Sequence, residues 1–125
     1  MIISWPIYKF DESSDFDTKT KEIVEEKIKE IQALEREGTY SVVLHNDPIN
    51  NIDYVVEVVV KVFGYGIAKA LWLTLKAHFS GRSMLWSGGF KKAKSNASHI
   101  ISFGPDPRCI EKGATSLTVT VERVI

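Results

Sequence analysis

Hydrophobic and polar residues recur with two different periods along this chain, and each period predicts a different kind of element. Within residues 18–37, Val24, Ile28 and Ile31 fall on one stripe, while Glu and Lys occupy most other positions. This spacing is typical of an amphipathic helix. Gly38 is a suitable residue to end it. The stripe is narrow, so we expect either a surface helix that rests on the domain or a seam for self-association.

The helical spacing recurs in three shorter segments. Residues 52–63 carry apolar side chains at i, i+3, i+4, i+7 and i+11. Several of them are β-branched and lower the intrinsic helix propensity, so burial against the rest of the protein must stabilise this helix. Residues 67–79 and 90–101 repeat the pattern, and Gly81 follows the first of these. We therefore expect three further helices between residues 52 and 101.

Strand patterns separate these helices. Residues 40–45 are rich in β-forming side chains, 82–86 can form a short strand, and 117–122 alternate strictly between apolar and polar residues. A Gly-Pro-Asp-Pro sequence at 104–107 interrupts the chain before the last of them. The order predicts an α+β fold, in which a three-stranded antiparallel sheet is packed by helices in the order β-α-α-β-α-β, with an extra N-terminal helix.

The length of 125 residues suits one domain with an appendage. We expect residues 1–38 to form an N-terminal extension that contains the helix at 18–37, and residues 39–125 to form the domain. The first 17 residues have no clear period, although some of their apolar side chains could dock elsewhere: Ile3, Trp5, Ile7 and Phe10.

Charge and cysteine content exclude several classes of function. The 16 basic and 16 acidic residues balance, so nothing global favours nucleic acid or an acidic membrane. The single cysteine, Cys109, cannot form an internal disulfide or a cysteine-based metal site, which fits a reducing compartment. The chain has no apolar stretch long enough to span a bilayer and lacks the features of a signal peptide. We therefore predict a cytoplasmic protein without metal or cofactor.

Candidate chemistry lies where strand 40–45 gives way to the next helix, at Asn46, Asp47 and Pro48. Taken alone, this sequence is most often a turn. The functional alternative places both side chains at a pocket. An ammonium ion has three donors and one charge, and the two side chains with a neutral nitrogen of His78 would match them. Charge-assisted bonds of this kind contribute about 1.5–3 kcal/mol each.

His78 has two other interpretations. It can be a core-edge histidine bonded to a carbonyl, or it can be a catalytic base. No glycine-elbow motif surrounds a possible nucleophile, and a metal site with His45 and Asp47 lacks ligand spacing. We therefore expect a recognition module and no enzymatic activity, although three side chains could act as nucleophiles: Ser80, Ser83 and Cys109.

Four segments together resemble the ClpS adaptor family. They are Val43–Pro48, Ile52–Val56, Lys61–Gly64 and Ala77–Gly81, and their order and spacing agree without a gap over 40–81. ClpS proteins are cytoplasmic or plastid adaptors that hand substrates with a destabilising N-terminal residue, an N-degron, to a Clp-type AAA+ unfoldase and its protease. The resemblance implies a ClpS-like sandwich and a non-catalytic adaptor.

The resemblance also implies roles for individual residues. The α-amine of the substrate would contact Asn46, Asp47 and His78. Substrates would carry N-terminal Leu, Phe, Tyr or Trp, and the partner would be the unfoldase N-domain, with no nucleic acid or membrane involved. The first side chain would enter a pocket formed by Leu44, Asn50, Ile52, Val55, Thr74 and Ala77.

Departures from the family pattern affect the pocket. Pro48 stands where many members have a second Asp that helps to bind the amine. Ile52 replaces the usual gate Met, and Thr74 and Ala77 stand where larger apolar residues are common. These differences imply a pocket of altered width and polarity.

Other departures affect the partner surface and the end of the chain. Lys91, Lys94 and Asn96 occupy positions where the family has Glu, Glu and Lys for docking on the unfoldase. Because paired charges would become repulsive, an alternative is a ClpS-like module with a different partner or without delivery. Residues 108–112 resemble the family's final strand and compete with 117–122 for that place.

Overall fold

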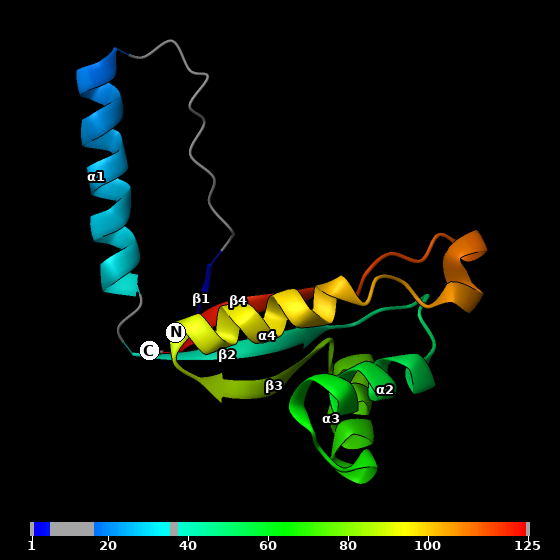
Figure 1. The fold of residues 1–125 in the computed structure, drawn as a ribbon. Coiled ribbons are helices and arrows are strands. Elements are labelled where there is room, and N and C mark those ends of the chain that lie inside the picture. The colour runs from blue at the N-terminus through cyan, green and yellow to red at the C-terminus, as the bar shows by residue number, and fades with distance from the viewer. Residues whose placement is uncertain (1, 6–16, 36–37, 125) are drawn as a thin grey trace.

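The structure, a computed structural model, describes residues 2–5, 17–35 and 38–124. Helices and strands alternate along most of the chain (Figure 1). The elements are β1 (Ile2–Trp5), α1 (Thr18–Glu35), β2 (Thr39–His45), α2 (Ile52–Phe63), α3 (Ile67–Ser80), β3 (Arg82–Gly88), α4 (Phe90–Ser102), the 3-10 helix η1 (Pro107–Lys112) and β4 (Val119–Val124).

The strands form one antiparallel sheet in the order β1-β4-β2-β3. The predicted α+β fold with the strands β2, β3 and β4 is confirmed. The prediction of three strands was incomplete, because β1 adds a fourth strand beside β4. A four-residue strand with no alternating pattern gives little signal in the sequence. Ile3 and Trp5 belong to β1, whereas Ile7 and Phe10 lie outside the described residues.

The last strand is β4, which lies two residues later than the 117–122 expected from the alternation, and the assignment of 108–112 to a strand is wrong. Residues 107–112 form η1 instead. Pro107 has no N–H to give to a sheet and suits the first turn of a helix. The Asp106 carboxylate accepts the Arg108 N–H at 3.0 Å, which caps that turn.

Helices α2, α3 and α4 cover one face of the sheet and enclose the core. Alternate residues of β2 point into it, so Tyr40, Val42 and Leu44 are almost fully buried. Apolar residues of the three helices complete the same cluster: Val55, Val58, Val59, Ala70, Leu73, Ala77, Phe90, Ala93 and Ile100. The β-branched helix α2 is thus held by burial, as its sequence requires.

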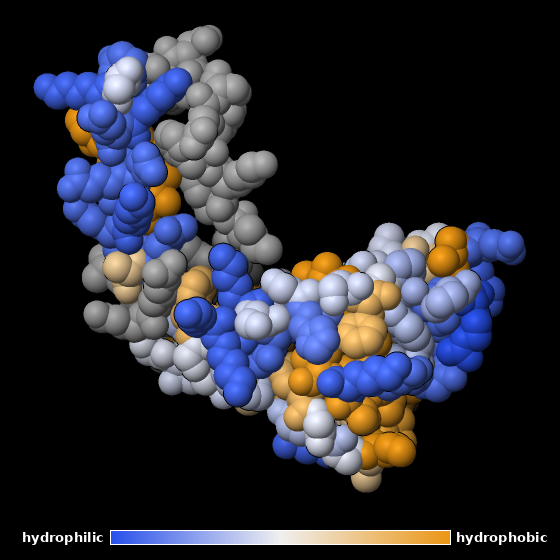
Figure 2. Space-filling view, in the orientation of Figure 1, coloured by the Kyte–Doolittle hydropathy of each residue, from blue (hydrophilic) through white to orange (hydrophobic). Residues whose placement is uncertain are grey.

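Helix α1 stands apart from the sheet and its three covering helices (Figure 1). Ile23 and Ile31 are exposed, and Figure 2 shows a mostly hydrophilic surface with hydrophobic side chains along its flank. The prediction of a helix resting on the domain is therefore wrong, while self-association stays a prediction. Residues 36–37 of the predicted helix lie outside the described residues. The predicted division between 38 and 39 also stays a prediction, although β1 joins the sheet of the later segment.

Candidate functional site

The candidate site forms where the end of β2 meets the end of α3. The Asn46 N–H donates to the Gly81 carbonyl at 2.9 Å, which ties the two chain ends together. Gly81 has a φ of 93°, in the left-handed region that favours glycine, and its N–H caps the helix at the Ala77 carbonyl. This backbone bond brings Asn46 close to His78, although the two are far apart in the sequence.

Asp47 organises the turn that follows. Its Oδ1 accepts the N–H groups of Ile49 and Asn50, each at 2.9 Å, and its Oδ2 accepts a short hydrogen bond from the Asn50 side chain. This is the Asx-turn chemistry that the sequence predicted as the simpler interpretation. Asp47 therefore contributes its negative charge to the site while most of its acceptor capacity serves the turn.

Asn50 anchors this turn to the C-terminal part of the chain. Its amide nitrogen donates to the Thr115 carbonyl at 2.9 Å, and its Oδ1 accepts the Asp106 N–H at 2.8 Å. The side chain is only 6% exposed. Asn50 is thus a structural wall of the site, and both N–H donors of its amide are already used.

All nine residues predicted for the amine contacts and the side-chain pocket line one cavity. Its volume is about 20 Å³, which is room for about one water molecule. His45 is a tenth lining residue that the prediction left out. The structure thus brings the predicted residues together, and their roles in binding stay predictions.

Four side chains form the apolar part of the cavity wall. Leu44, Val55 and Ala77 are buried in its wall, and Ile52 is half-buried. Thr74 donates its hydroxyl hydrogen to the Ala70 carbonyl of its own helix at 2.8 Å, so its one donor is already used. The cavity can therefore receive a small apolar group more readily than a polar one.

The rim, in contrast, holds free polar groups. Asn46 and His78 are both exposed. Within the described residues neither side chain has a hydrogen bond, and the His78 ring packs edge-on against Phe79 with centroids 4.9 Å apart. An amide oxygen and an imidazole nitrogen are therefore available to accept hydrogen bonds above an apolar cavity.

His45 is the last residue of β2, where strand alternation turns its side chain away from the core. Its Nε2 lies 2.8 Å from Thr120 Oγ1, and that hydroxyl is 2.9 Å from Glu122 Oε2. Arg82 Nη2 also bonds both oxygens of Glu122, at 2.6 and 2.7 Å. Burial raises the pKa of Glu122, but the hydrogen bonds from Arg82 and Thr120 lower it below its ordinary value. In the sequence, the only sign that His45 lies at the rim of the cavity is that it directly precedes Asn46.

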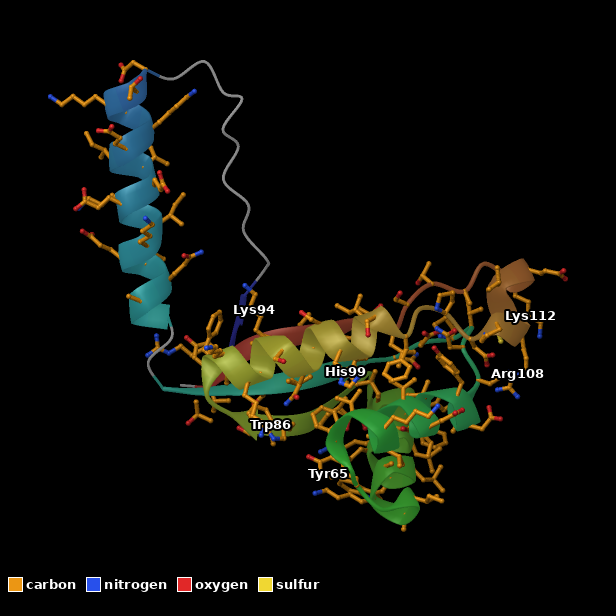
Figure 3. All side chains as sticks on the ribbon, in the orientation of Figure 1. Tyr65, Trp86, Lys94, His99, Arg108 and Lys112 are labelled. Carbon is orange, nitrogen blue, oxygen red and sulfur yellow. The ribbon has the colours of Figure 1, made fainter. Side chains whose placement is uncertain are left out.

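A second charged cluster lies beside the start of α2. Arg108 of η1, which Figure 3 labels, bonds the carboxylates of Asp53 and Asp106. The Arg108 hydrogen bonds hold the pKa of Asp106 at about 2 and also lower that of Asp53. Asn51 occupies the N-cap position of α2, yet its side chain donates to Asp106 at 3.2 Å and to Cys109 Sγ at 3.3 Å. The C-terminal segment is thus tied to α2 as well as to Asn50.

The predicted partner residues lie on α4. Lys91 and Lys94 are exposed, whereas Asn96 is half-buried (Figure 3 labels Lys94). The Asn96 amide nitrogen is buried and lacks a hydrogen-bond partner among the described residues. The two lysines are therefore the accessible part of the predicted surface.

Neither a metal cluster nor a membrane span is found in the described part of the chain. No three His, Cys, Asp or Glu side chains there gather closely enough to hold a metal ion. No helix there combines the length and the apolar character needed to cross a bilayer.

Comparison with known proteins gives concordant matches. The family model described as "ATP-dependent Clp protease adaptor protein ClpS" matches residues 35–105. The ClpS adapter of Erwinia tasmaniensis is 26% identical over 86 residues, which cover 69% of this chain and 79% of the relative. The ClpS adapter of Serratia proteamaculans is 29% identical over 72 residues, covering 58% and 68%.

One solved structure supports the fold. Agrobacterium tumefaciens ClpS2 bound to L-phenylalaninamide superposes with a TM-score of 0.61 at 21% identity, covering 71% of this chain and all of the other. The family match spans the cavity residues and the α4 lysines, but it ends before η1 and β4.

Proposed function

Since the chain belongs to the ClpS family of ATP-dependent Clp protease adaptors, we propose that it captures proteins through a free, apolar N-terminal residue and delivers them to a Clp-type AAA+ unfoldase. The observation that carries the proposal is the single cavity lined by all nine predicted residues. An apolar hollow with free acceptors at its rim matches the first residue of a protein chain, which has an ammonium group beside an apolar side chain. Capture requires no covalent chemistry, so the protein acts as an adaptor and not as an enzyme.

Each polar residue has a distinct part in binding the amine. Asn46 Oδ1 and a neutral His78 nitrogen accept two of the three ammonium hydrogens. Asp47 supplies the opposing charge, and the second lone pair of its Oδ2 is left for the third hydrogen after the bond from Asn50. Pro48 offers no second carboxylate, so Asp47 is the main source of negative charge at the amine.

The size of the cavity favours the smaller members of the substrate class. A volume of about 20 Å³ admits little more than a water molecule, so a bound side chain must displace Ile52 or its neighbours. Displacement grows with the size of the ligand. We therefore place Leu ahead of Phe and Tyr, and Trp last.

Fluorescence titration with matched peptides tests this function. A peptide with a free N-terminal Leu should bind, and its acetylated twin should not, because acetylation removes the charge and two donors. Moving Leu to the second position behind Gly should also abolish binding. Equal binding of the free and acetylated peptides would refute capture through the amine.

Substitutions in the protein sharpen the test. Asn46→Ala and His78→Ala should each weaken binding of the free peptide by about ten-fold or more, since each removes a charge-assisted bond. His99→Ala is the matched control for His78, because His99 is an exposed histidine on α4 away from the cavity. Loss of binding in the control as well would contradict a specific role for His78.

The α4 surface favours an acidic docking partner. Lys91 and Lys94 are exposed on a helix that has no acidic residue, so the surface that meets them must carry negative charge. We propose an unfoldase N-domain with an acidic docking surface. A pull-down with that N-domain should succeed for the native chain and fail for Lys91→Glu/Lys94→Glu. If the variant instead binds more tightly, the partner carries basic charge at this surface.

A further inference from the structure

The outer side of α3 carries an apolar surface that the domain leaves uncovered. Four of its large apolar side chains are exposed: Ile67 at 71%, Leu71 at 39%, Trp72 at 62% and Phe79 at 79%. Their spacing places them along one side of the helix, and Figure 2 shows hydrophobic surface gathered over the α2 and α3 end of the domain. An aromatic side chain alone can bury about 150–250 Å², so the α3 surface amounts to roughly 400 Å² of apolar area. A patch of this size marks an interaction site.

Helix α1 carries a second uncovered apolar surface. Ile23 and Ile31 are 48% and 53% exposed, and α1 stands apart from the three helices that cover the sheet (Figure 1). Its 18 residues extend about 27 Å, whereas the 14 residues of α3 extend about 21 Å. Helix α1 is therefore long enough to cover the whole α3 surface.

Basic residues lie beside the α3 surface. Lys69 and Lys76 are three positions before and four positions after Trp72, so both lie on the Trp72 side of the helix. Within the described part of the chain neither lysine pairs with a carboxylate. Their ammonium groups lie instead over the rings of Tyr65 and Trp72, 3.9 and 5.3 Å from the centroids. A partner of this surface therefore gains attraction by placing carboxylates there.

Acidic residues take the corresponding place on α1. Glu26 and Glu30 follow Ile23 by three and seven positions, so they lie on one side of the apolar pair. Among the described residues Glu26 has no ion-pair partner, and the bond of Glu30 to Lys27 is between exposed side chains and is therefore weak. When α1 and α3 run in the same direction, the acidic side of α1 meets the basic side of α3.

The position of α1 in the chain keeps it away from its own α3. Only residues 36–38 separate α1 from the start of β2 at Thr39. The end of α3 is held at the other end of β2, where the Asn46 N–H bonds the Gly81 carbonyl. The seven residues of β2 span about 23 Å. A second copy of the chain can meet α1 without this separation.

We infer that α1 of one copy packs on α3 of a second copy, and reciprocally, so that the protein forms a symmetric dimer. Two-fold symmetry makes the contact twice. If α1 buries about as much area as the roughly 400 Å² of α3, the two contacts together bury about 1,600 Å², which is the size of a standard specific interface. This dimer leaves the N-terminal-residue cavity of each copy at the far end of β2 and does not depend on the proposed function.

Sedimentation equilibrium of the full chain tests the dimer, over concentrations from about 1 μM to about 1 mM. Trp72→Ala and Ile31→Gln should each raise the dissociation constant of the dimer by about ten-fold or more, because buried anchors dominate such contacts. Ile110→Gln is the matched control, since Ile110 is 56% exposed but lies on η1, outside both surfaces. A monomer at every concentration, or equal weakening by the control, overturns the inference.

Exchanging the charges identifies which helices meet. Lys69→Glu/Lys76→Glu and Glu26→Lys/Glu30→Lys should each weaken the dimer, because like charges then face each other at both contacts. An equal mixture of the two variants should restore association, since every α1 then meets an α3 of opposite charge. If only one variant weakens the dimer, like helices pair with each other, and the inference is wrong. Failure of the mixture to associate also overturns it.

Discussion

The Asn50 side chain donates a 2.9 Å hydrogen bond to the Thr115 carbonyl, 65 residues further along the chain. Together with the bond from the Asp106 N–H to Asn50 Oδ1 at 2.8 Å, it fastens the cavity wall to the C-terminal segment. A residue that the family resemblance assigns to a binding pocket is therefore also a tertiary anchor of this protein.

Replacing Asn50 by Ala should lower the free energy of unfolding. The change leaves the Asp106 N–H and the Thr115 carbonyl without their partner, and a buried unpaired group costs about 1–3 kcal/mol. We expect urea denaturation to show a loss of about 2–4 kcal/mol in the free energy of unfolding. Asn46→Ala is the matched control, since that side chain is exposed and should change stability by about 0.5 kcal/mol or less. A loss below about 1 kcal/mol for Asn50→Ala would contradict the anchoring role.

The ion pair of Asp106 should make folding sensitive to acid. Its folded pKa is about 2, against an ordinary value of 3.8. Because the folded value is the lower one, the stabilisation is complete above about pH 4 and is lost as the pH falls toward 2. Asp106→Asn keeps a capping side chain for the Arg108 N–H but removes the charge. Urea denaturation between pH 5 and 2 should show a smaller loss for this variant than for the native chain, and parallel curves would argue against the pair.

Local periodicity explains how much of the fold the sequence predicted. The stripe of α2 and the alternation of β4 are properties of neighbouring residues. The helix is confirmed, and the strand is confirmed two residues later than predicted. The cavity residues were found because the family pattern fixes spacing from the end of β2 to the end of α3. In contrast, β1 has four residues and no period, so its pairing with β4 left no signal.

Long-range polar pairs could not be predicted in this way. Asp53 and Arg108 lie 55 positions apart, and no local pattern connects an exposed aspartate with an arginine after a proline. His45 was not predicted to line the cavity for a related reason. Strand alternation assigns it to the outer face of the sheet, where it forms a hydrogen bond with Thr120. Polar contacts between distant elements require the fold itself before they can be recognised.

Removing Arg82 should reverse the pH dependence of the stability that the buried Glu122 carboxylate contributes. Glu122 is 5% exposed, and the hydrogen bonds of Arg82 and Thr120 outweigh burial to give a lowered pKa. In the native chain its contribution to stability is therefore present above its unfolded pKa and lost as the pH falls through the folded value. In the Arg82→Ala variant, burial should dominate and raise the pKa of Glu122 above its unfolded value. The contribution of Glu122 to the free energy of unfolding should then become more favourable as the pH falls.

Stability measurements at two pH values can detect this reversal. At pH 7, Arg82→Ala should lose about 1–3 kcal/mol, less than for a fully buried pair because Arg82 itself is half exposed. Between pH 7 and 4 the gap to the native chain should narrow. The double variant Arg82→Ala/Glu122→Gln should recover part of the loss at pH 7, and a gap that is constant with pH would disprove the reversal.

Enlarging the cavity at Ile52 should change which N-terminal residue is preferred. Ile52 is half-buried and lines both the cavity and a larger open groove that adjoins it. Ile52→Ala removes three carbons at the boundary of a space of about 20 Å³, so Phe and Trp should enter with less displacement. We expect the affinity ratio of Trp to Leu peptides to rise by about ten-fold, with a stability loss of about 1–2 kcal/mol. Competition titration with the two peptides measures the ratio directly. Ile49→Ala is the matched control, because Ile49 is half-buried and lines the groove but not the cavity. If both variants change the ratio equally, or neither does, Ile52 does not limit the width of the cavity.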